Sequence, residues 1–151
     1  MKVVLQRAKS AYVEIDKEII SEISKGFVLL WGIQKGDSVI DADMMVKKIG
    51  NLRVFSDSSG KMNKSLKDIE GEILLISQFT LLANISKGNR PSFIDAEDPD
   101  DANKMLTYIS KELSSYGKVK EGKFGAHMNI SLENDGPVTI YLESQNGQFK
   151  F

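Results

Sequence analysis

Three polar residues close an apolar run in the middle of the chain: Ser77, Gln78 and Thr80, which follow residues 73–76 and flank Phe79. Hydroxyl and amide groups at the end of a strand can hydrogen-bond a substrate, and the neighbouring backbone N–H groups can stabilise an oxyanion. The same residue types also end strands without any catalytic role. By itself, this segment therefore indicates a candidate substrate site without defining one.

A glycine–proline pair, Gly136 and Pro137, separates two segments of alternating apolar residues, 128–132 and 138–142. Such a pair between strands normally forms a turn, so we expect a turn over residues 133–137. The alternative is a cis peptide bond, which occurs in about 5–6% of X–Pro bonds. Carbonyls held rigidly around a cis bond could accept hydrogen bonds from an ammonium group and exclude a side chain from the same place.

Residues 87–93 combine two cations, Lys87 and Arg90, with a glycine, a proline and an aromatic residue. This combination is typical of contacts with phosphate and ribose. An ordinary solvated loop explains the same residues equally well.

The residue counts exclude several kinds of chemistry. The chain has no cysteine and a single histidine, His127, so it has no thiolate nucleophile, disulfide, cysteine-based zinc site or iron–sulfur cluster. His127 precedes Met128 at the start of a predicted strand, and we expect it on the surface rather than in a triad. Phosphate-binding and serine-hydrolase motifs are also absent from the sequence. We expect neither a metal nor a cofactor.

Composition and charge predict one soluble globular domain over residues 1–151, with 41% hydrophobic and 27% charged residues. The net charge is −1, so no global basic field would attract nucleic acid, and RNA contact must rest on local cations. The first residues lack a signal-peptide core, and no apolar run approaches the length of a membrane span. We expect a cytoplasmic protein with no membrane partner and no DNA partner.

The elements that would position these residues are mostly strands. Alternation over residues 2–8 and 11–15, with a return strand over 19–23, predicts a hairpin. Near-continuous apolar segments over 27–33 and 73–79 predict central strands that are buried on both faces.

Two segments have helical spacing instead. One begins at Asp37 or Ser38 and ends near Gly50, and the other runs from Asp98, as its cap, to Gly117. Because strands cluster at both ends of the chain with helices between them, the sequence predicts an α+β fold. Its sheet should be largely antiparallel and barrel-like, with two main helices.

Taken together, these segments resemble the D-aminoacyl-tRNA deacylase family over residues 1 to about 144. Ser-Gln-x-Thr and Gly-Pro are the two signature motifs of that family, and their co-occurrence about 56 residues apart is highly specific. The segments that carry the resemblance are residues 5–7, 60–63, 77–81, 87–93, 122–128 and 134–139.

The resemblance implies a homodimer whose active sites lie at the subunit interface. Such an enzyme hydrolyses the ester between a D-amino acid and the terminal adenosine of tRNA, and it also removes glycine. Gly136 and Pro137 would form a cis bond that enters the partner's site, captures the substrate's amino group and rejects an L side chain. Arg7 would hold this pair in its orientation.

The resemblance also implies the other site roles. Ser77, Gln78 and Thr80 would line the pocket at the ester, and the remaining contacts would come from Phe79 and Met128 to the substrate and from Lys87 and Arg90 to RNA. Thr80 is one candidate nucleophile, but no histidine, cysteine or lysine base lies near it in sequence. We favour a mechanism in which the tRNA's own 2′-hydroxyl activates or positions water and backbone N–H groups form the oxyanion hole.

The main alternative is a non-catalytic module that binds the 3′ end of tRNA. The chain departs from the family pattern at a few positions. Leu82 and Asn84 stand where relatives more often have an aromatic residue and an aspartate, and Trp31 is bulkier than the expected small aliphatic residue. Residues 145–151 extend past the usual end and could alter the rim of the site.

Overall fold

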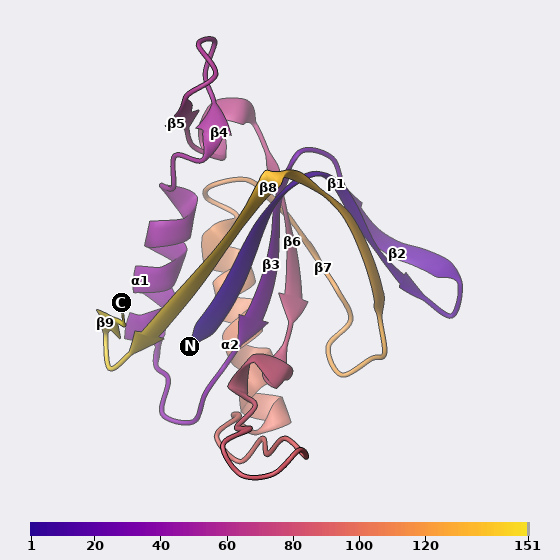
Figure 1. Cartoon of the computed structure of the whole chain (residues 1–151), viewed down its shortest axis with the longest axis vertical. Helices are drawn as coiled ribbons and strands as arrows, with labels where there is room; N and C mark the ends of the chain where they lie inside the picture. Colours follow the sequence, from indigo (N-terminus) through magenta and orange to yellow (C-terminus); the bar gives the residue numbers. More distant parts are fainter. Residues whose placement is uncertain (151) are drawn as a thin grey trace.

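The computed structural model describes residues 1–150 and contains one curled sheet with two helices on one of its faces (Figure 1). The predicted N-terminal hairpin is present, formed by β1 (Lys2–Ile15) and β2 (Glu18–Ile23). The first half of β1 also pairs with β3 (Gly26–Gly32), and β8 (Asn129–Gln145) pairs along the other edge of β1. These three pairings are antiparallel.

The predicted largely antiparallel sheet is confirmed only in part, because the sheet is mixed: four strand pairings are antiparallel and two are parallel. Strand β3 pairs in parallel with β6 (Glu72–Ser77), and β6 pairs in parallel with β7 (Lys118–Glu121). The physical reason is the connections: parallel neighbours need a long crossover, and here each crossover contains a helix. The helix α1 (Val39–Gly50) lies between β3 and β6 in the chain, and α2 (Pro99–Leu113) lies between β6 and β7.

The core has two parts because successive residues of a strand face opposite sides of the sheet. Phe27, Leu29 and Trp31 of β3 face the helices and are fully buried together with Met45 and Ile49 of α1. A second, smaller cluster lies on the inner face of the curl. It contains Ala8, Ala11, Val13, Ile23, Val28, Leu74 and Ile76.

Both helices begin where the sequence predicts. Ser38 is the N-cap of α1, and Asp98 is the N-cap of α2 with Pro99 in the first turn. The second helix ends at Leu113, before the predicted Gly117. Gly117 is not a left-handed cap: a Cβ there would lie 2.5 Å from the Gly71 carbonyl oxygen, so glycine is needed for close backbone contact.

The predicted turn over residues 133–137 is also wrong. Strand β8 continues through Gly136 and Pro137, whose peptide bond is cis, and its register with β1 shifts on either side of Ala8. The polar residues form a bulge in the strand rather than a reversal, because Asn134 supplies the missing backbone partner: its Oδ1 accepts a hydrogen bond from Val138 N–H at 2.7 Å.

A small ribbon stands away from the sheet at one end of the molecule (Figure 1). It is formed by β4 (Phe55–Ser56) and β5 (Met62–Lys64), and the short helix η1 (Lys67–Ile69) follows it.

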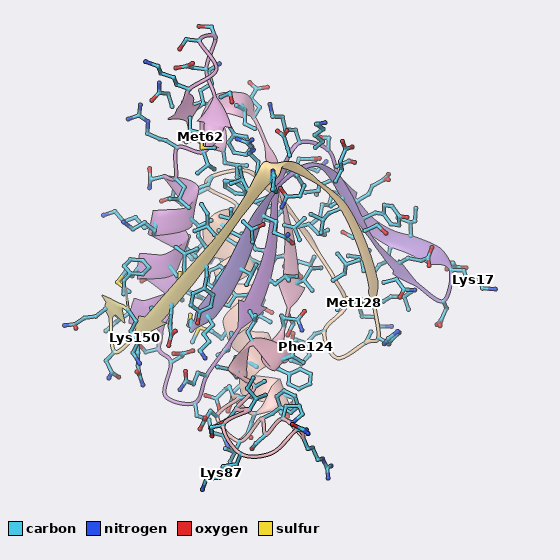
Figure 2. The ribbon with its side chains drawn as sticks, in the orientation of Figure 1. Lys17, Met62, Lys87, Phe124, Met128 and Lys150 are labelled. Carbon is cyan, nitrogen blue, oxygen red and sulfur yellow. The ribbon has the colours of Figure 1, made fainter. Side chains whose placement is uncertain are left out.

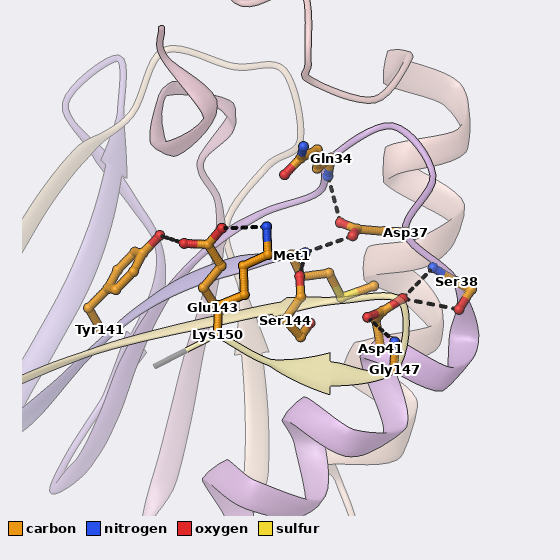
Figure 3. Close-up of polar contacts among 10 residues, drawn as sticks. All are labelled: Met1, Gln34, Asp37, Ser38, Asp41, Tyr141, Glu143, Ser144, Gly147 and Lys150. Atoms are coloured by element: carbon orange, nitrogen blue, oxygen red, sulfur yellow. Dashed lines mark hydrogen bonds and ion pairs between the residues drawn. The ribbon is translucent and has the colours of Figure 1, made fainter.

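The C-terminal extension folds back onto β8 through β9 (Gln148–Phe149). Gly147 N–H donates to the Asp41 carboxylate at 2.9 Å, which fixes the extension against the start of α1 (Figure 3). Residues 145–150 therefore pack away from the pocket described below, and Phe151 lies outside the described residues. Neither helix of the described chain is long and apolar enough to span a membrane.

Candidate functional site

A pocket of about 600 Å³ opens at the carboxyl ends of the parallel strands β3 and β6, where Trp31 lies opposite Ser77. It forms there because β7 leaves β6 early: its pairing ends at Leu75, and Gly122 N–H makes the last bond to the Leu75 carbonyl at 3.0 Å. The edge of β6 beyond Leu75 is therefore open. Ligands commonly bind at this end of parallel strands.

The Ser-Gln-x-Thr segment turns sharply at the edge of this pocket. Gln78 N–H donates to the Trp31 carbonyl at 2.8 Å, and the chain then forms the short helix η2 (Phe79–Leu82). Gly32 permits this arrangement, since a Cβ there would lie 2.4 Å from Leu82 Cδ2. Gln78 Nε2 donates to Thr80 Oγ1, so the Thr80 hydroxyl fixes the Gln78 side chain.

Aromatic and sulfur-containing side chains form the walls. Phe79 and Phe93 meet edge to face with ring centroids 4.9 Å apart, and Phe79 remains 54% exposed. Phe124 and Met128 approach from the segment that follows β7 (Figure 2). An exposed aromatic face at a pocket is suited to stacking on a nucleobase.

Charged residues also line the pocket. Lys35, Glu97 and Asp98 line it, and Glu97 N–H donates to the Ile33 carbonyl at 3.0 Å, joining two loops around the opening. The indole N–H of buried Trp31 has no hydrogen-bond partner among the described residues.

Gly136 and Pro137 lie at the opposite end of the sheet. On β8 they lie beside Arg7 of β1, and Arg7 in turn pairs with Phe27 of β3. The pocket begins further along β3, at Trp31. Four residues of strand separate these positions, about 13 Å. Neither Gly136 nor Pro137 lines the pocket of its own protomer.

The buried Arg7 guanidinium contacts three acceptor groups at this end of the sheet, two of Asp135 and one of Val54. Its Nε donates to the Asp135 carbonyl at 2.8 Å and lies 3.5 Å from the Asp135 carboxylate. Its Nη1 donates to the Val54 carbonyl. The planar guanidinium suits this task because its donors have a fixed geometry.

Lys87 and Arg90 lie on an exposed loop that a backbone bridge between Asn84 and Ser92 closes. The bridge consists of two hydrogen bonds, Asn84 N–H to Ser92 O at 2.8 Å and the reverse at 3.0 Å. Neither cation lines the pocket, and Lys87 points away from the body of the protein (Figure 2).

Within one protomer the structure thus joins only part of the predicted site. Ser77, Gln78, Phe79 and Met128 line the pocket, and Thr80 contacts Gln78 from outside the lining. Arg7, Gly136 and Pro137 are at the other end of the sheet, and Lys87 and Arg90 lie outside the pocket.

Several lining residues were missed by the sequence analysis. Phe93 and Phe124 lie in residues 87–93 and 122–128, two of the segments that carry the family resemblance. Their place in these segments is the signal that could have indicated them as site residues. His127 is exposed, as predicted, and lies at the pocket lining. Among residues 1–150, no group of three or more His, Asp or Glu side chains could hold a metal ion.

Comparison with known proteins assigns this chain to a family. The family model described as D-Tyr-tRNA(Tyr) deacylase matches residues 4–143. A Persephonella marina protein named D-aminoacyl-tRNA deacylase is 48% identical over 145 residues, covering 96% of this chain and 99% of that protein. A Staphylococcus aureus protein of the same name is 48% identical over 151 residues, covering 99% and 100%. The chain belongs to the D-Tyr-tRNA(Tyr) deacylase family.

Two solved structures have the same fold as this chain. A protein named c-Myc DNA Unwinding Element Binding Protein superposes with a TM-score of 0.90 at 44% identity, covering 96% of this chain and 99% of the other. A structure described as a probable eukaryotic D-amino acid tRNA deacylase superposes with a TM-score of 0.76 at 15% identity, covering 93% and 97%. The second likeness is one of fold alone.

Proposed function

We propose that this chain hydrolyses the ester of D-aminoacyl-tRNA and releases tRNA and the D-amino acid. The observation that carries the proposal is the pocket at Ser77 and Gln78, in a chain that belongs to the deacylase family. A pocket of about 600 Å³ with an exposed aromatic wall has room for a terminal adenosine and its aminoacyl group.

The active enzyme in this proposal is a homodimer. The pocket and the Gly136–Pro137 pair lie at opposite ends of one sheet, so one protomer cannot bring them together. A two-fold axis places the same surface of each copy against the other, so both sites are completed at once. Gly136 and Pro137 are both exposed and free to enter a partner's pocket.

Chirality is selected by backbone groups in this arrangement. The carbonyls of Gly136 and Pro137 accept hydrogen bonds from the substrate's ammonium group, and the same backbone leaves no room for an L side chain. Arg7 keeps the pair in orientation through its bond to the Asp135 carbonyl. Glycine has no side chain to reject, so glycyl-tRNA is also a substrate.

The ester is cleaved by water rather than by a protein nucleophile. The Thr80 hydroxyl already accepts a hydrogen bond from Gln78, and a threonine without a general base is a weak nucleophile. The substrate's 2′-hydroxyl positions or activates the water, and backbone N–H groups at the start of η2, which have no partner within the helix, stabilise the oxyanion.

RNA contact comes from exposed cations beside the pocket, including Lys87 and Arg90. Each phosphate contact releases counterions, so binding weakens as salt rises. A cytoplasmic location and the lack of a DNA partner remain predictions.

Turnover distinguishes the enzyme from a module that only binds the tRNA 3′ end. D-Tyr-tRNA incubated with protein at one hundredth of its concentration should lose its ester over many turnovers. Protection of the ester at stoichiometric protein, without turnover, would support the binding module instead.

The role of the 2′-hydroxyl is tested in the same assay with tRNA ending in 2′-deoxyadenosine. The rate should be lower by about 100-fold, the size typical of losing one catalytic group.

A further inference from the structure

The ribbon formed by β4 and β5 carries a local excess of positive charge. Residues 53–67 contain four cations and one carboxylate, although the whole chain has a net charge of −1. The carboxylate is Asp57, and the cations are Arg53, Lys61, Lys64 and Lys67. All four cations are exposed.

The tip of this ribbon is tightly organised. The Asp57 carboxylate accepts hydrogen bonds from Ser59 N–H and Oγ at 2.8 and 2.7 Å, from Lys61 N–H at 3.0 Å and from Asn63 Nδ2 at 2.6 Å. Arg53 then clamps Asn63, donating from Nε to its carbonyl at 2.8 Å and from Nη2 to its Oδ1 at 3.1 Å. Lys61 and Lys64 therefore project from a defined backbone, so the backbone of the ribbon need not become ordered when they bind a ligand.

The base of the ribbon is attached to the Gly136–Pro137 bulge. One guanidinium, that of Arg7, donates both to the carbonyl of Asp135, just before Gly136, and to the carbonyl of Val54, just before β4. The Arg7 side chain thus joins the base of the ribbon to the bulge, and the two segments lie close together. Figure 2 shows Met62 of the ribbon and Lys87 of the pocket loop at opposite ends of the protomer.

We infer that the ribbon acts in trans on the RNA: Lys61 and Lys64 of one protomer contact backbone phosphates of the tRNA whose 3′ end occupies the partner's pocket. The inference rests on the proposed function, in which Gly136 and Pro137 enter that pocket. A bulge inserted there brings the attached ribbon to the same pocket's mouth. The tRNA is then held by Lys87 and Arg90 of one protomer and by the ribbon of the other.

RNA phosphate is the ligand that fits these features. Lysine ammonium groups are exposed point charges that bind phosphate without demanding a fixed angle. The Asp57 carboxylate is occupied by its four hydrogen bonds, which hold its pKa well below the ordinary value and keep it ionised. The next carboxylate along the chain, Asp68, lies near Arg53 and Lys64 and accepts hydrogen bonds from Ser65 N–H and Oγ, both at 2.8 Å. A contact with carboxylates of the partner subunit is the alternative that the test below separates.

The first test compares two substrates of the Lys61→Ala/Lys64→Ala variant. With D-Tyr-tRNA, the KM should rise about tenfold, and the slope of log(kcat/KM) against log salt should become shallower by about 2, one for each lost phosphate contact. With D-tyrosyl-adenosine, which has the same ester and no phosphate, KM should be unchanged. The matched control is Lys47→Ala/Lys111→Ala, which removes two exposed cations from α1 and α2. An unchanged KM for tRNA, or an equal rise for both substrates, would overturn the inference.

The second test uses dimers of two differently tagged protomers and separates trans from cis action. In the first dimer, Gly136→Ala and the two lysine changes are in the same protomer; the one working site then has an intact ribbon and a wild-type KM. In the second dimer, Gly136→Ala is in one protomer and the lysine changes are in the other; the working site has the altered ribbon and a raised KM. The reversed pattern would show that the ribbon acts in cis.

The two proposals fail in different ways. A wild-type dimer without turnover of D-Tyr-tRNA rejects the proposed function. If the wild-type dimer turns over D-Tyr-tRNA but the mixed dimers show the reversed pattern of KM values, only the role of the ribbon is rejected.

Discussion

The guanidinium of Arg7 donates to the backbone carbonyl of Asp135 at 2.8 Å, immediately before the Gly136–Pro137 pair. These residues are 128 positions apart in the chain, and β1 and β8 bring them together. Arg7 is only 7% exposed. Its hydrogen bonds hold two backbone segments together, and the proposed site, which is made of main-chain groups, would require such support.

Replacing Arg7 with lysine should therefore damage both stability and activity. Lysine keeps the charge but cannot reach the Asp135 and Val54 carbonyls together, so a buried acceptor loses its donor at about 1–3 kcal/mol. Deacylation of D-Tyr-tRNA should fall by about 100-fold, as expected when a reacting geometry shifts by about 1 Å. Urea unfolding and initial rates measure the two effects.

The control for this change is Lys9→Ala. Lys9 lies on the same strand and pairs with Glu133 at 2.9 Å, but both side chains are largely exposed. Its removal should leave stability and rate unchanged within error. Wild-type activity in Arg7→Lys would contradict the role of Arg7.

Gly136→Ala should abolish D-selective deacylation while leaving the dimer intact. Gly136 has a φ of +146°, where side chains are disfavoured, and a Cβ would lie 2.8 Å from Val138 Cγ2 and 3.2 Å from Arg7 Nη2. The backbone at Gly136, which faces the substrate in the proposed mechanism, should therefore shift. Gly36→Ala is the matched control, since Gly36 also has a positive φ (+87°) but open space around it. Unchanged D-over-L selectivity in Gly136→Ala would refute the chiral role.

Thr80→Ala should retain activity within about tenfold of wild type. Its hydroxyl accepts a bond from Gln78, so the variant loses part of the positioning of Gln78, which corresponds to about 1 kcal/mol. Single-turnover deacylation, with substrate binding measured separately, checks this. Complete loss of the chemical step with retained binding would identify Thr80 as the nucleophile.

Asp41→Asn should reduce stability at neutral pH, with an effect that disappears in acid. Burial alone would raise the pKa of the Asp41 carboxyl, but hydrogen bonds from Gly147 and Ser38 outweigh burial and hold the pKa below its ordinary value (Figure 3). A depressed folded pKa stabilises the fold above about pH 4, and this contribution is lost as pH falls through the folded value.

The difference between wild type and Asp41→Asn should accordingly be about 1–2 kcal/mol at pH 7. It should narrow steadily below about pH 4. Urea unfolding across this pH range measures it. A difference that stays constant with pH would mean that the Asp41 charge contributes nothing to the fold.

Local patterns in the sequence predicted the elements well. The caps Ser38 and Asp98, the apolar strands at 27–33 and 73–79 and the two-helix α+β class are confirmed, apart from boundaries such as the end of β6 at Ser77. Each of these features depends on residues that are close in the chain. Membership of the deacylase family, inferred from the motifs, is also confirmed.

What the sequence did not predict depends on long-range pairing. The parallel β3–β6–β7 arrangement follows from how two helical crossovers pack, which apolar periodicity does not encode. Gly136 and Pro137 look like a turn locally, and only Asn134 and Arg7 together make them part of a continuous strand. The separation of this pair from the pocket is likewise visible only in the folded sheet. The roles assigned to the individual site residues stay predictions.

The central claim is most directly tested by chiral selectivity at catalytic concentration. Wild-type protein, present at one hundredth of the substrate concentration, is incubated in parallel with D-Tyr-tRNA and L-Tyr-tRNA, and the remaining ester is followed over time. We predict complete hydrolysis of the D-ester and a kcat/KM at least about 100-fold lower for the L-ester, a ratio that steric exclusion can supply. Equal rates for the two esters, or no turnover of the D-ester, would contradict the account.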